Sequence, residues 1–435
     1  MQKIKTLKKE SINLDIVSLD DAGYGVTLDG KHGVFGALPG ESVSFIPITR
    51  KRKKLFGRAG AITNAAPGRV EARCSAAGYC GGCSLQHMSA AFQLQFKQER
   101  LRREFESCPP IEWLPPLGDD DYNYRSKARL GVKFVEKKGR VLVGFREKMK
   151  PYIADIDVCH VLQSPVATLL EPLARLIESL DNPKAVPQIE VAIGDYGSAL
   201  VFRHLEPLAD HEPGLFKTFG QDFKVDIYLQ PGSPQTVHKL YPEDGIERLV
   251  YDLPDQGIRI SFHPLDFTQV NPRVNRKMVN LALDLLEVDE KDQVLDAFCG
   301  IGNFSLALAT RVSEVLGLEN AQASVERARE NARLNRISNA RFEVVDLFLE
   351  EDSTPILESI NKVLVDPPRT GALELCKKLA TSKVERVVYV SCNPRTLARD
   401  TRILVDNGYQ LRLLGIIDMF PHTTHVESIA LLTRK

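Results

Sequence analysis

The sequence predicts an α/β, Rossmann-like domain at its C-terminal end, preceded by a small β-barrel and a central α+β region. Strands and helices alternate from residue 272 onward, a pattern typical of a parallel sheet with helices on both faces. Several short strands, separated by Gly, Asp and Pro, fill residues 11–64, as in barrels of the oligonucleotide-binding (OB) class. A cysteine- and glycine-rich stretch without a regular period follows at 66–90. We therefore expect three domains, at 1–64, 65–260 and 261–435.

The composition is that of a globular protein. The chain has 435 residues, of which 43% are hydrophobic and 26% charged, values that exclude a collagen-like, coiled-coil or wholly disordered protein. No apolar run approaches the ~18 residues that a membrane-spanning helix needs, and the N-terminus lacks the apolar stretch of a secretory signal. We therefore expect a cytoplasmic protein with no membrane partner. Its eight cysteines are too sparse for a disulfide scaffold, so clustered cysteines predict metal ligands or catalysts.

The net charge of zero hides a strong gradient along the chain. Residues 1–150 carry 27 Lys and Arg against 16 Asp and Glu, whereas residues 151–435 carry 30 against 41. Most of the excess lies in the run 50–54 and in residues 122–150, which hold 10 basic and 2 acidic residues. Such blocks attract phosphate backbones by neutralising their charge, although a solvated basic face would have the same composition. The gradient favours a nucleic-acid partner.

Individual elements follow from periodicity and turn residues. Strands are expected at 12–19, 23–30, 32–38, 41–49 and 56–63, with the basic run on a hairpin between the last two, followed by a helix at 90–107 that packs on the C-terminal domain. The central region is expected to hold one helix, at 165–180, among strands at 127–135, 140–146, 188–195, 198–205, 224–230 and 257–263. The α/β region is expected to hold helices at 272–288, 303–312, 323–336, 373–381 and 395–407, with strands at 293–299, 313–319, 340–346, 362–366, 386–391, 411–418 and 428–434.

A glycine turn joins the first strand of the α/β region to the next helix. Gly300 and Gly302 let the backbone approach a ligand there, and the helix that follows favours negative charge. The dinucleotide fingerprint requires a third Gly, but Ser305 occupies that position. Glu319 ends the next strand, where it can accept hydrogen bonds from a ribose diol, and Asp346 ends the third, near an adenine edge. The set favours S-adenosylmethionine over NAD, against the alternative of a tight turn without a ligand.

Cys392 lies just beyond the end of an apolar strand, at the edge where open parallel sheets bind ligands. Asn393 can cap the next helix, and Pro394 suits its first turn. We expect the helix N-terminus, with Arg395 and Arg399 nearby, to lower the pKa of the thiol. The alternative is a buried cysteine that acts as a small apolar residue.

A methyl donor beside a nucleophilic cysteine predicts methylation at C5 of uracil. Addition of a thiolate to C6 makes C5 nucleophilic, and a base must then remove the C5 proton. Glu427 is the best candidate for that base. Asp366 opens an Asp-Pro-Pro-Arg segment at the same edge, in which Arg369 replaces the aromatic residue of amino-group methyltransferases and argues against N-methylation.

A cysteine cluster precedes the long helix. Cys74, Cys80 and Cys83 lie close together in sequence, and Cys159 is a possible fourth ligand. Four thiolates can hold either zinc or an iron–sulfur cluster. The spacing alone leaves both metals open.

The whole chain resembles the RNA uracil-5-methyltransferase family. The resemblance implies that the N-terminal barrel is a TRAM domain, which binds RNA, and that the cysteines Cys74, Cys80, Cys83 and Cys159 hold a [4Fe-4S] cluster. It also implies that Cys392 is the nucleophile and Glu427 the base. The positions implied to bind S-adenosylmethionine are Gln269, Phe298, Asn303, Glu319, Asp346 and Asp366.

Within that family, a TRAM domain together with a cluster resembles the branch that acts on 23S ribosomal RNA. The transfer-RNA branch lacks both features, and a short ribosomal branch lacks the TRAM domain. The resemblance thus implies 5-methyluridine formation in 23S ribosomal RNA by an enzyme expected to be monomeric. A transfer-RNA or dual-site enzyme, and a non-enzymatic RNA-binding chaperone or cluster-based sensor, remain the alternatives.

Overall fold

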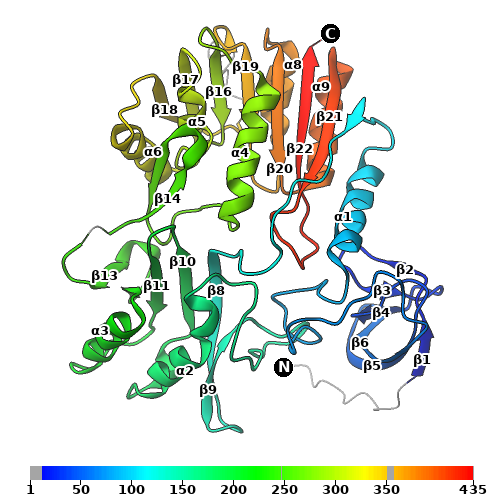
Figure 1. Ribbon diagram of the computed structural model, residues 1–435, viewed down its shortest axis with the longest axis vertical. Helices are drawn as coiled ribbons and strands as arrows, with labels where there is room; N and C mark the ends of the chain where they lie inside the picture. The colour runs from blue at the N-terminus through cyan, green and yellow to red at the C-terminus, as the bar shows by residue number, and fades with distance from the viewer. Residues whose placement is uncertain (1–11, 246, 350–356, 435) are drawn as a thin grey trace.

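The computed structural model describes residues 12–245, 247–349 and 357–434. Figure 1 shows a curled N-terminal sheet beside a central sheet with two helices, and a larger α/β sheet above them that contains the C-terminus. No helix in these described ranges is both long and apolar enough to cross a membrane.

The N-terminal sheet has six short strands in the order β1-β5-β6-β4-β3-β2. It closes around a small core that includes Val34, Val43 and Phe45. The β5–β6 hairpin carries the basic run at its exposed turn, as the sequence predicted. The assignment of this sheet to the OB class stays a prediction. The strands are β1 (Ile12–Asp15), β2 (Ser18–Leu19), β3 (Gly25–Val26), β4 (His32–Phe35), β5 (Ser42–Lys51) and β6 (Lys54–Thr63).

The central sheet is mostly antiparallel, in the order β13-β12-β11-β10-β8-β9. The expectation of a single helix here is wrong, because α3 (Glu212–Phe223) packs beside α2 (Leu170–Glu178). Gly214 and Gly220 weaken the helix propensity of α3, but Phe216 and Phe219 bury one face of it in the central core. The strands are β8 (Lys127–Val135), β9 (Arg140–Gly144), β10 (Gln188–Ile193), β11 (Ser198–Arg203), β12 (Asp226–Gln230) and β13 (His238–Tyr241).

The α/β sheet has eight strands in the order β18-β17-β16-β19-β20-β22-β21-β7. The first five are parallel, as predicted, but β22 runs antiparallel to both β20 and β21, because β21 and β22 form a hairpin. The strands are β16 (Gln293–Ala297), β17 (Glu314–Glu319), β18 (Ala340–Val344), β19 (Lys362–Val365), β20 (Arg386–Ser391), β21 (Tyr409–Ile417), β22 (Glu427–Arg434) and β7 (Glu112–Trp113). The helices are α4 (Pro272–Leu286), α5 (Ser305–Ala309), α6 (Gln322–Leu334), α8 (Leu373–Thr381) and α9 (Pro394–Asp406).

One early segment of the chain packs against this late sheet. Helix α1 (Ala90–Glu104) begins at Ser89, whose hydroxyl accepts a hydrogen bond from the Phe92 amide at 3.3 Å. Leu101 and Phe105 lie in the same core as α8 and α9. The chain then continues into β7, which pairs with β21 at the sheet edge. Figure 1 shows α1 bridging the N-terminal sheet and the α/β sheet.

A two-stranded hairpin joins the central sheet to the α/β sheet. It consists of β14 (Leu249–Leu253) and β15 (Ile258–Phe262), so the predicted boundary at residue 260 falls inside a strand. Tyr251, Ile260 and Phe262 are buried in the core of the α/β sheet. The hairpin therefore packs with the C-terminal part of the chain.

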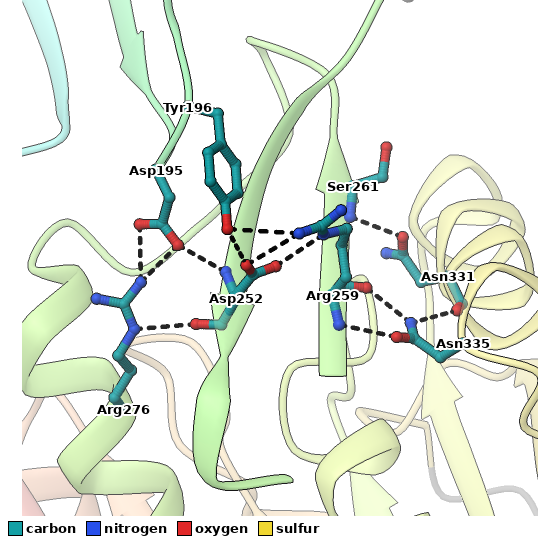
Figure 2. A network of polar contacts seen from close by, with 8 residues as sticks. All are labelled: Asp195, Tyr196, Asp252, Arg259, Ser261, Arg276, Asn331 and Asn335. Atoms are coloured by element: carbon teal, nitrogen blue, oxygen red, sulfur yellow. Dashed lines mark hydrogen bonds and ion pairs between the residues drawn. The ribbon is translucent and has the colours of Figure 1, made fainter. Parts of the chain in front are cut away.

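Figure 2 shows the polar network that holds this hairpin between the two sheets. Arg276 of α4 binds both carboxylate oxygens of Asp195, at 2.7 and 2.6 Å. Asp195 also accepts a hydrogen bond from the Asp252 amide of β14 at 2.7 Å. Because Asp195 lies in the β10–β11 turn, these contacts tie the central sheet to α4.

The other half of the network fixes the hairpin to helix α6. The Asn335 side chain accepts from the Arg259 amide at 2.8 Å and donates to the Arg259 carbonyl at 2.7 Å. One turn earlier, the Asn331 side chain accepts from the Ser261 amide at 2.9 Å. The two asparagines thus occupy the free edge of β15 much as another strand would (Figure 2).

Candidate active site

The predicted nucleophile and base lie side by side at the carboxyl edge of the parallel strands. β20 ends at Ser391, which pairs with Ser428 of β22. Cys392 and Glu427 are the next residues along these two strands. The antiparallel direction of β22 therefore brings the start of that strand to the edge where β20 ends.

Asp366 joins the same edge from the neighbouring strand β19. Its amide donates to the Ala297 carbonyl at 3.2 Å, which ties it to the end of β16. Burial, and then the charge of Asp296, raise the pKa of Asp366 to about 7. Burial and the charge of Asp366 in turn raise the pKa of Glu427 well above its ordinary value. Glu427 itself is only 5% exposed.

The expectation that the Cys392 pKa is lowered is wrong. Burial, and then the charges of Glu427 and Asp366, raise the pKa of this thiol to about 11, while Arg369 lowers it by a smaller amount. Cys392 is therefore held as a thiol at neutral pH. Burial, together with the two carboxyl groups beside it, outweighs the effect of the helix N-terminus that the sequence indicated.

The two arginines expected to lower that pKa are bound elsewhere. Arg399 donates to the Asp400 carboxylate at 2.8 Å and to the Thr370 carbonyl at 2.9 Å. Arg395 is exposed and lies 3.7 Å from Glu104 of α1. Proximity in sequence could not identify the partner of Arg395, because Glu104 of α1 lies almost 300 positions away.

The glycine turn after β16 is built on three left-handed residues. Phe298, Gly300 and Gly302 have φ values of +66°, +53° and +94°. Residues other than Gly, Asn and Asp seldom adopt a positive φ, so the backbone at Phe298 is unusual. The Gly300 amide donates to Glu319 at 3.3 Å, and the Ala321 amide donates to the same carboxylate at 2.9 Å. Glu319 is thus held beside the turn, where the sequence placed it.

Ser305 explains the departure from the dinucleotide fingerprint. Its hydroxyl donates to Asp296, which is fully buried beneath the turn. Burial raises the pKa of Asp296 to about 7, and the hydrogen bonds from Ser305 oppose that shift. A glycine at this position would remove the hydroxyl that bonds one oxygen of the buried Asp296 carboxyl, while its other oxygen has no hydrogen-bond partner among the described atoms.

The Asn303 amide is held by two residues that sequence reasoning missed. Its oxygen accepts from the Tyr251 hydroxyl and the Asn275 side chain, both at 2.9 Å, and its nitrogen donates to Asn275 at 3.0 Å. Tyr251 belongs to the β14–β15 hairpin and Asn275 to α4. Neither residue lies in a recognisable motif, so only the fold reveals their contact with the turn.

The loop that contains Gln269 is fixed by the start of β8. The Ser126 amide donates to the Val270 carbonyl at 2.8 Å, and the Lys127 ammonium donates to the Pro264 and Asp266 carbonyls at 2.5 and 2.9 Å. Burial lowers the pKa of Lys127 to about 8. The Gln269 side chain is half-buried, with no hydrogen-bond partner among the described residues.

The residues after β18 add an aromatic and acidic surface beside the glycine turn. The Phe298 and Phe348 rings lie 5.5 Å apart between centroids. Asp346 is exposed and accepts a hydrogen bond from the Phe348 amide at 3.0 Å. Two rings and a carboxylate beside the glycine turn are groups that an adenine base can contact.

The four predicted cysteine ligands line one cavity. Cys74, Cys80, Cys83 and Cys159 come together there from two distant segments, and none forms a disulfide. No group of three or more His, Cys, Asp or Glu side chains in the described part of the chain is arranged to hold a metal ion. Both zinc and a four-iron cluster bind four thiolates, so the four cysteines that line this cavity are a donor set that either metal accepts.

Comparison with known proteins places this site in a class. The glycine turn, the acidic strand ends and the sheet order are those of the S-adenosylmethionine-dependent methyltransferase fold. The model of the tRNA (Uracil-5-)-methyltransferase family matches residues 243–435. The 23S rRNA (uracil(1939)-C(5))-methyltransferase RlmD of Nitrosococcus oceani is 49% identical, over 100% of this chain and 99% of the relative. The chain belongs to the uracil-5-methyltransferase family.

Two further relatives agree with this assignment. The 23S rRNA (uracil(1939)-C(5))-methyltransferase RlmD of Alcanivorax borkumensis is 46% identical, over 96% of each chain. Among solved structures, the Pyrococcus abyssi tRNA (uracil-54, C5)-methyltransferase in complex with S-adenosyl-L-homocysteine aligns with a TM-score of 0.74 and 28% identity. That alignment covers 97% of this chain and 100% of the Pyrococcus chain.

Proposed function

We propose that this enzyme transfers a methyl group from S-adenosylmethionine to C5 of a uridine in 23S ribosomal RNA. The observation that carries the proposal is the adjacency of Cys392 and Glu427 on the β20–β22 pair, next to the glycine turn. Full-length relatives of 46% and 49% identity bear the name of that ribosomal activity.

The geometry supports a covalent route in balanced steps. The Cys392 thiolate adds to C6 of uracil, and the C5=C6 electron pair moves toward O4 to give an enolate. C5 then attacks the sulfonium methyl, which leaves S-adenosylhomocysteine. Glu427 takes the C5 proton, and the electron pair of the C5–H bond re-forms C5=C6 as the thiolate leaves. The target uridine must leave its stack to reach this buried edge.

In this proposal, different residues bind different parts of S-adenosylmethionine. Glu319 holds the ribose diol, Asp346 and Phe298 contact the adenine, and Asp366 faces the sulfonium end with Gln269 and Asn303. Burial raises the pKa of Asp296, Asp366 and Glu427. The charge of Asp296 adds to the rise at Asp366, and the charge of Asp366 adds to the rise at Glu427. A cationic sulfonium beside Asp366 favours their ionised forms, so binding of the donor promotes ionisation of the base.

The remaining predicted parts serve RNA binding and structure. The exposed basic run 50–54 and the basic stretch 122–150 would contact the phosphate backbone, with the N-terminal sheet as a TRAM domain. Cys74, Cys80, Cys83 and Cys159 would hold a [4Fe-4S] cluster, which when bound cross-links the cysteine loop to the central domain.

A release assay tests this function. RNA carrying tritium at uracil C5 is incubated with the enzyme, using separate 23S ribosomal and transfer-RNA transcripts, with and without S-adenosylmethionine. We expect tritium to appear in water only with the cofactor and the ribosomal transcript. Release from transfer RNA alone would favour the activity named for the Pyrococcus abyssi structure, release from both a dual-site enzyme, and release from neither would contradict the proposal.

Loss of the hydrogen bonds between Asn275 and Asn303 should weaken cofactor binding. Asn275→Ala removes two of the hydrogen bonds to the Asn303 amide, and we expect the Kd for S-adenosylmethionine to rise about tenfold, the scale of one well-formed hydrogen bond. Isothermal titration calorimetry measures the change. Asn280→Ala is the matched control, because Asn280 lies on the same helix and bonds Gln256 and Asp255 instead. Equal affinities of the two variants would contradict this prediction.

A further inference from the structure

The β21–β22 loop, residues 418–426, leads directly into Glu427. The segment that follows the cysteine cluster forms hydrogen bonds to the centre of this loop. The His422 carbonyl accepts hydrogen bonds from the Ser84 amide at 2.7 Å and the Leu85 amide at 3.0 Å. Both donors follow Cys83 in sequence, so the cysteine loop and the β21–β22 loop meet at one peptide group.

Gln93 of α1 holds the same residue from the other side. Its side-chain oxygen accepts from the His422 amide at 2.8 Å. Its side-chain nitrogen lies 3.1 Å from Nδ1 of the His422 ring and donates to the Met88 carbonyl at 2.9 Å. Every hydrogen of this buried side-chain amide therefore has a partner.

The rest of the loop is also held from outside the α/β sheet. Lys97, one turn after Gln93, donates to Asp418 at 2.6 Å and to the Phe420 carbonyl at 3.0 Å. The Tyr124 hydroxyl donates to the Pro421 carbonyl at 3.0 Å. The conformation of the loop is thus set largely by α1 and the central region.

We propose that Gln93 is a positioning residue for proton removal, acting through His422 on the placement of Glu427. The inference rests on the covalent mechanism proposed above. Ile417 and Glu427 pair at the two ends of the loop, so loss of the Gln93 hydrogen bonds to His422 can shift Glu427, while Cys392, which follows β20, stays in place. Removal of the C5 proton, which depends on Glu427, should therefore slow more than formation of the adduct.

Single-turnover kinetics of Gln93→Met test this proposal. Methionine keeps the length and volume of the side chain but removes every hydrogen bond to His422. With 23S transcript and S-adenosylmethionine, we expect resolution of the covalent protein–RNA adduct to slow about tenfold, and its formation to change less than twofold. Gln95→Met is the matched control, because Gln95 lies on the exposed face of the same helix and, among the described residues, its side chain bonds Glu99 alone.

Hydrogen–deuterium exchange gives a readout that does not depend on catalysis. Faster exchange is expected within 418–426 in Gln93→Met and not in Gln95→Met, with β20 unchanged in both. If Gln93→Met resolves the covalent adduct at the wild-type rate, or if adduct formation and adduct resolution slow equally, the inference is overturned. If Glu427→Gln and the wild type both form no adduct, the covalent mechanism itself fails, and that result is distinct from failure of the role of Gln93.

Discussion

Replacing Cys392 with alanine is expected to abolish methyl transfer and the covalent RNA adduct together. The thiol lies at the sheet edge beside Glu427 and Asp366. Loss of a catalytic nucleophile lowers turnover on the order of 10⁴-fold or more. Methylation is measured by transfer of a radiolabelled methyl group to RNA, and the adduct by its retarded migration under denaturing conditions.

The control for this substitution is Cys108→Ala, which removes a half-buried thiol just after α1. We expect Cys108→Ala to retain wild-type turnover. Methylation by Cys392→Ala at a measurable fraction of the wild-type rate would rule out the covalent route.

The raised pKa of Cys392 also predicts how adduct formation depends on pH. With a pKa of about 11, the thiolate is a minor species at pH 7. Because only the thiolate attacks, the single-turnover rate should rise about tenfold for each pH unit between 7 and 9. A rate already level at pH 7 would show that RNA or cofactor binding lowers the thiol pKa below this range.

Glu427→Gln should trap the reaction after methyl transfer. The amide matches the shape of the carboxyl group but cannot accept the C5 proton, so turnover should fall by about 10²–10⁴-fold. The methylated adduct should accumulate in stoichiometric amounts. Because burial raises the pKa of Glu427 and so disfavours its charged form, a neutral amide of the same shape should be tolerated and the fold should be retained.

Glu385→Gln is the control for this prediction, since Glu385 lies exposed at the opposite end of β20. Its turnover should equal that of the wild type. Normal turnover of Glu427→Gln would remove Glu427 as the base and leave Asp366 as the remaining carboxylate beside the thiol.

Much of the α/β fold could be predicted because each element has a strong local signal. Buried parallel strands such as 386–391 read as unbroken apolar runs, and the cap Asn393 and Pro394 mark the start of α9. α3 lacked such a signal, because two glycines interrupt it and its apolar face is visible only beside the central sheet. The reversal of β22 is likewise a property of the hairpin rather than of its residues.

The same contrast holds for the site. Cys392 and Glu427 could be proposed from the chemistry that they make possible together, and the fold then places them as neighbours. The effect of Arg395 and Arg399 could not be judged from sequence, because their carboxylate partners decide whether their charge reaches the thiol. The roles of Tyr251, Asn275 and Gln93 depend on contacts between distant segments, which no local pattern encodes.

The position of α1 has a consequence for how the chain folds during synthesis. Leu101 and Phe105 leave the ribosome early, yet the strands and helices that cover them, β21, α8 and α9, are made about 270 residues later. At ordinary translation rates of roughly 5–20 residues per second, this apolar surface stays uncovered for tens of seconds before the elements that pack on it are synthesised. Contacts of such long sequence range are slow to form. The catalytic edge is therefore completed only after the last strand has emerged.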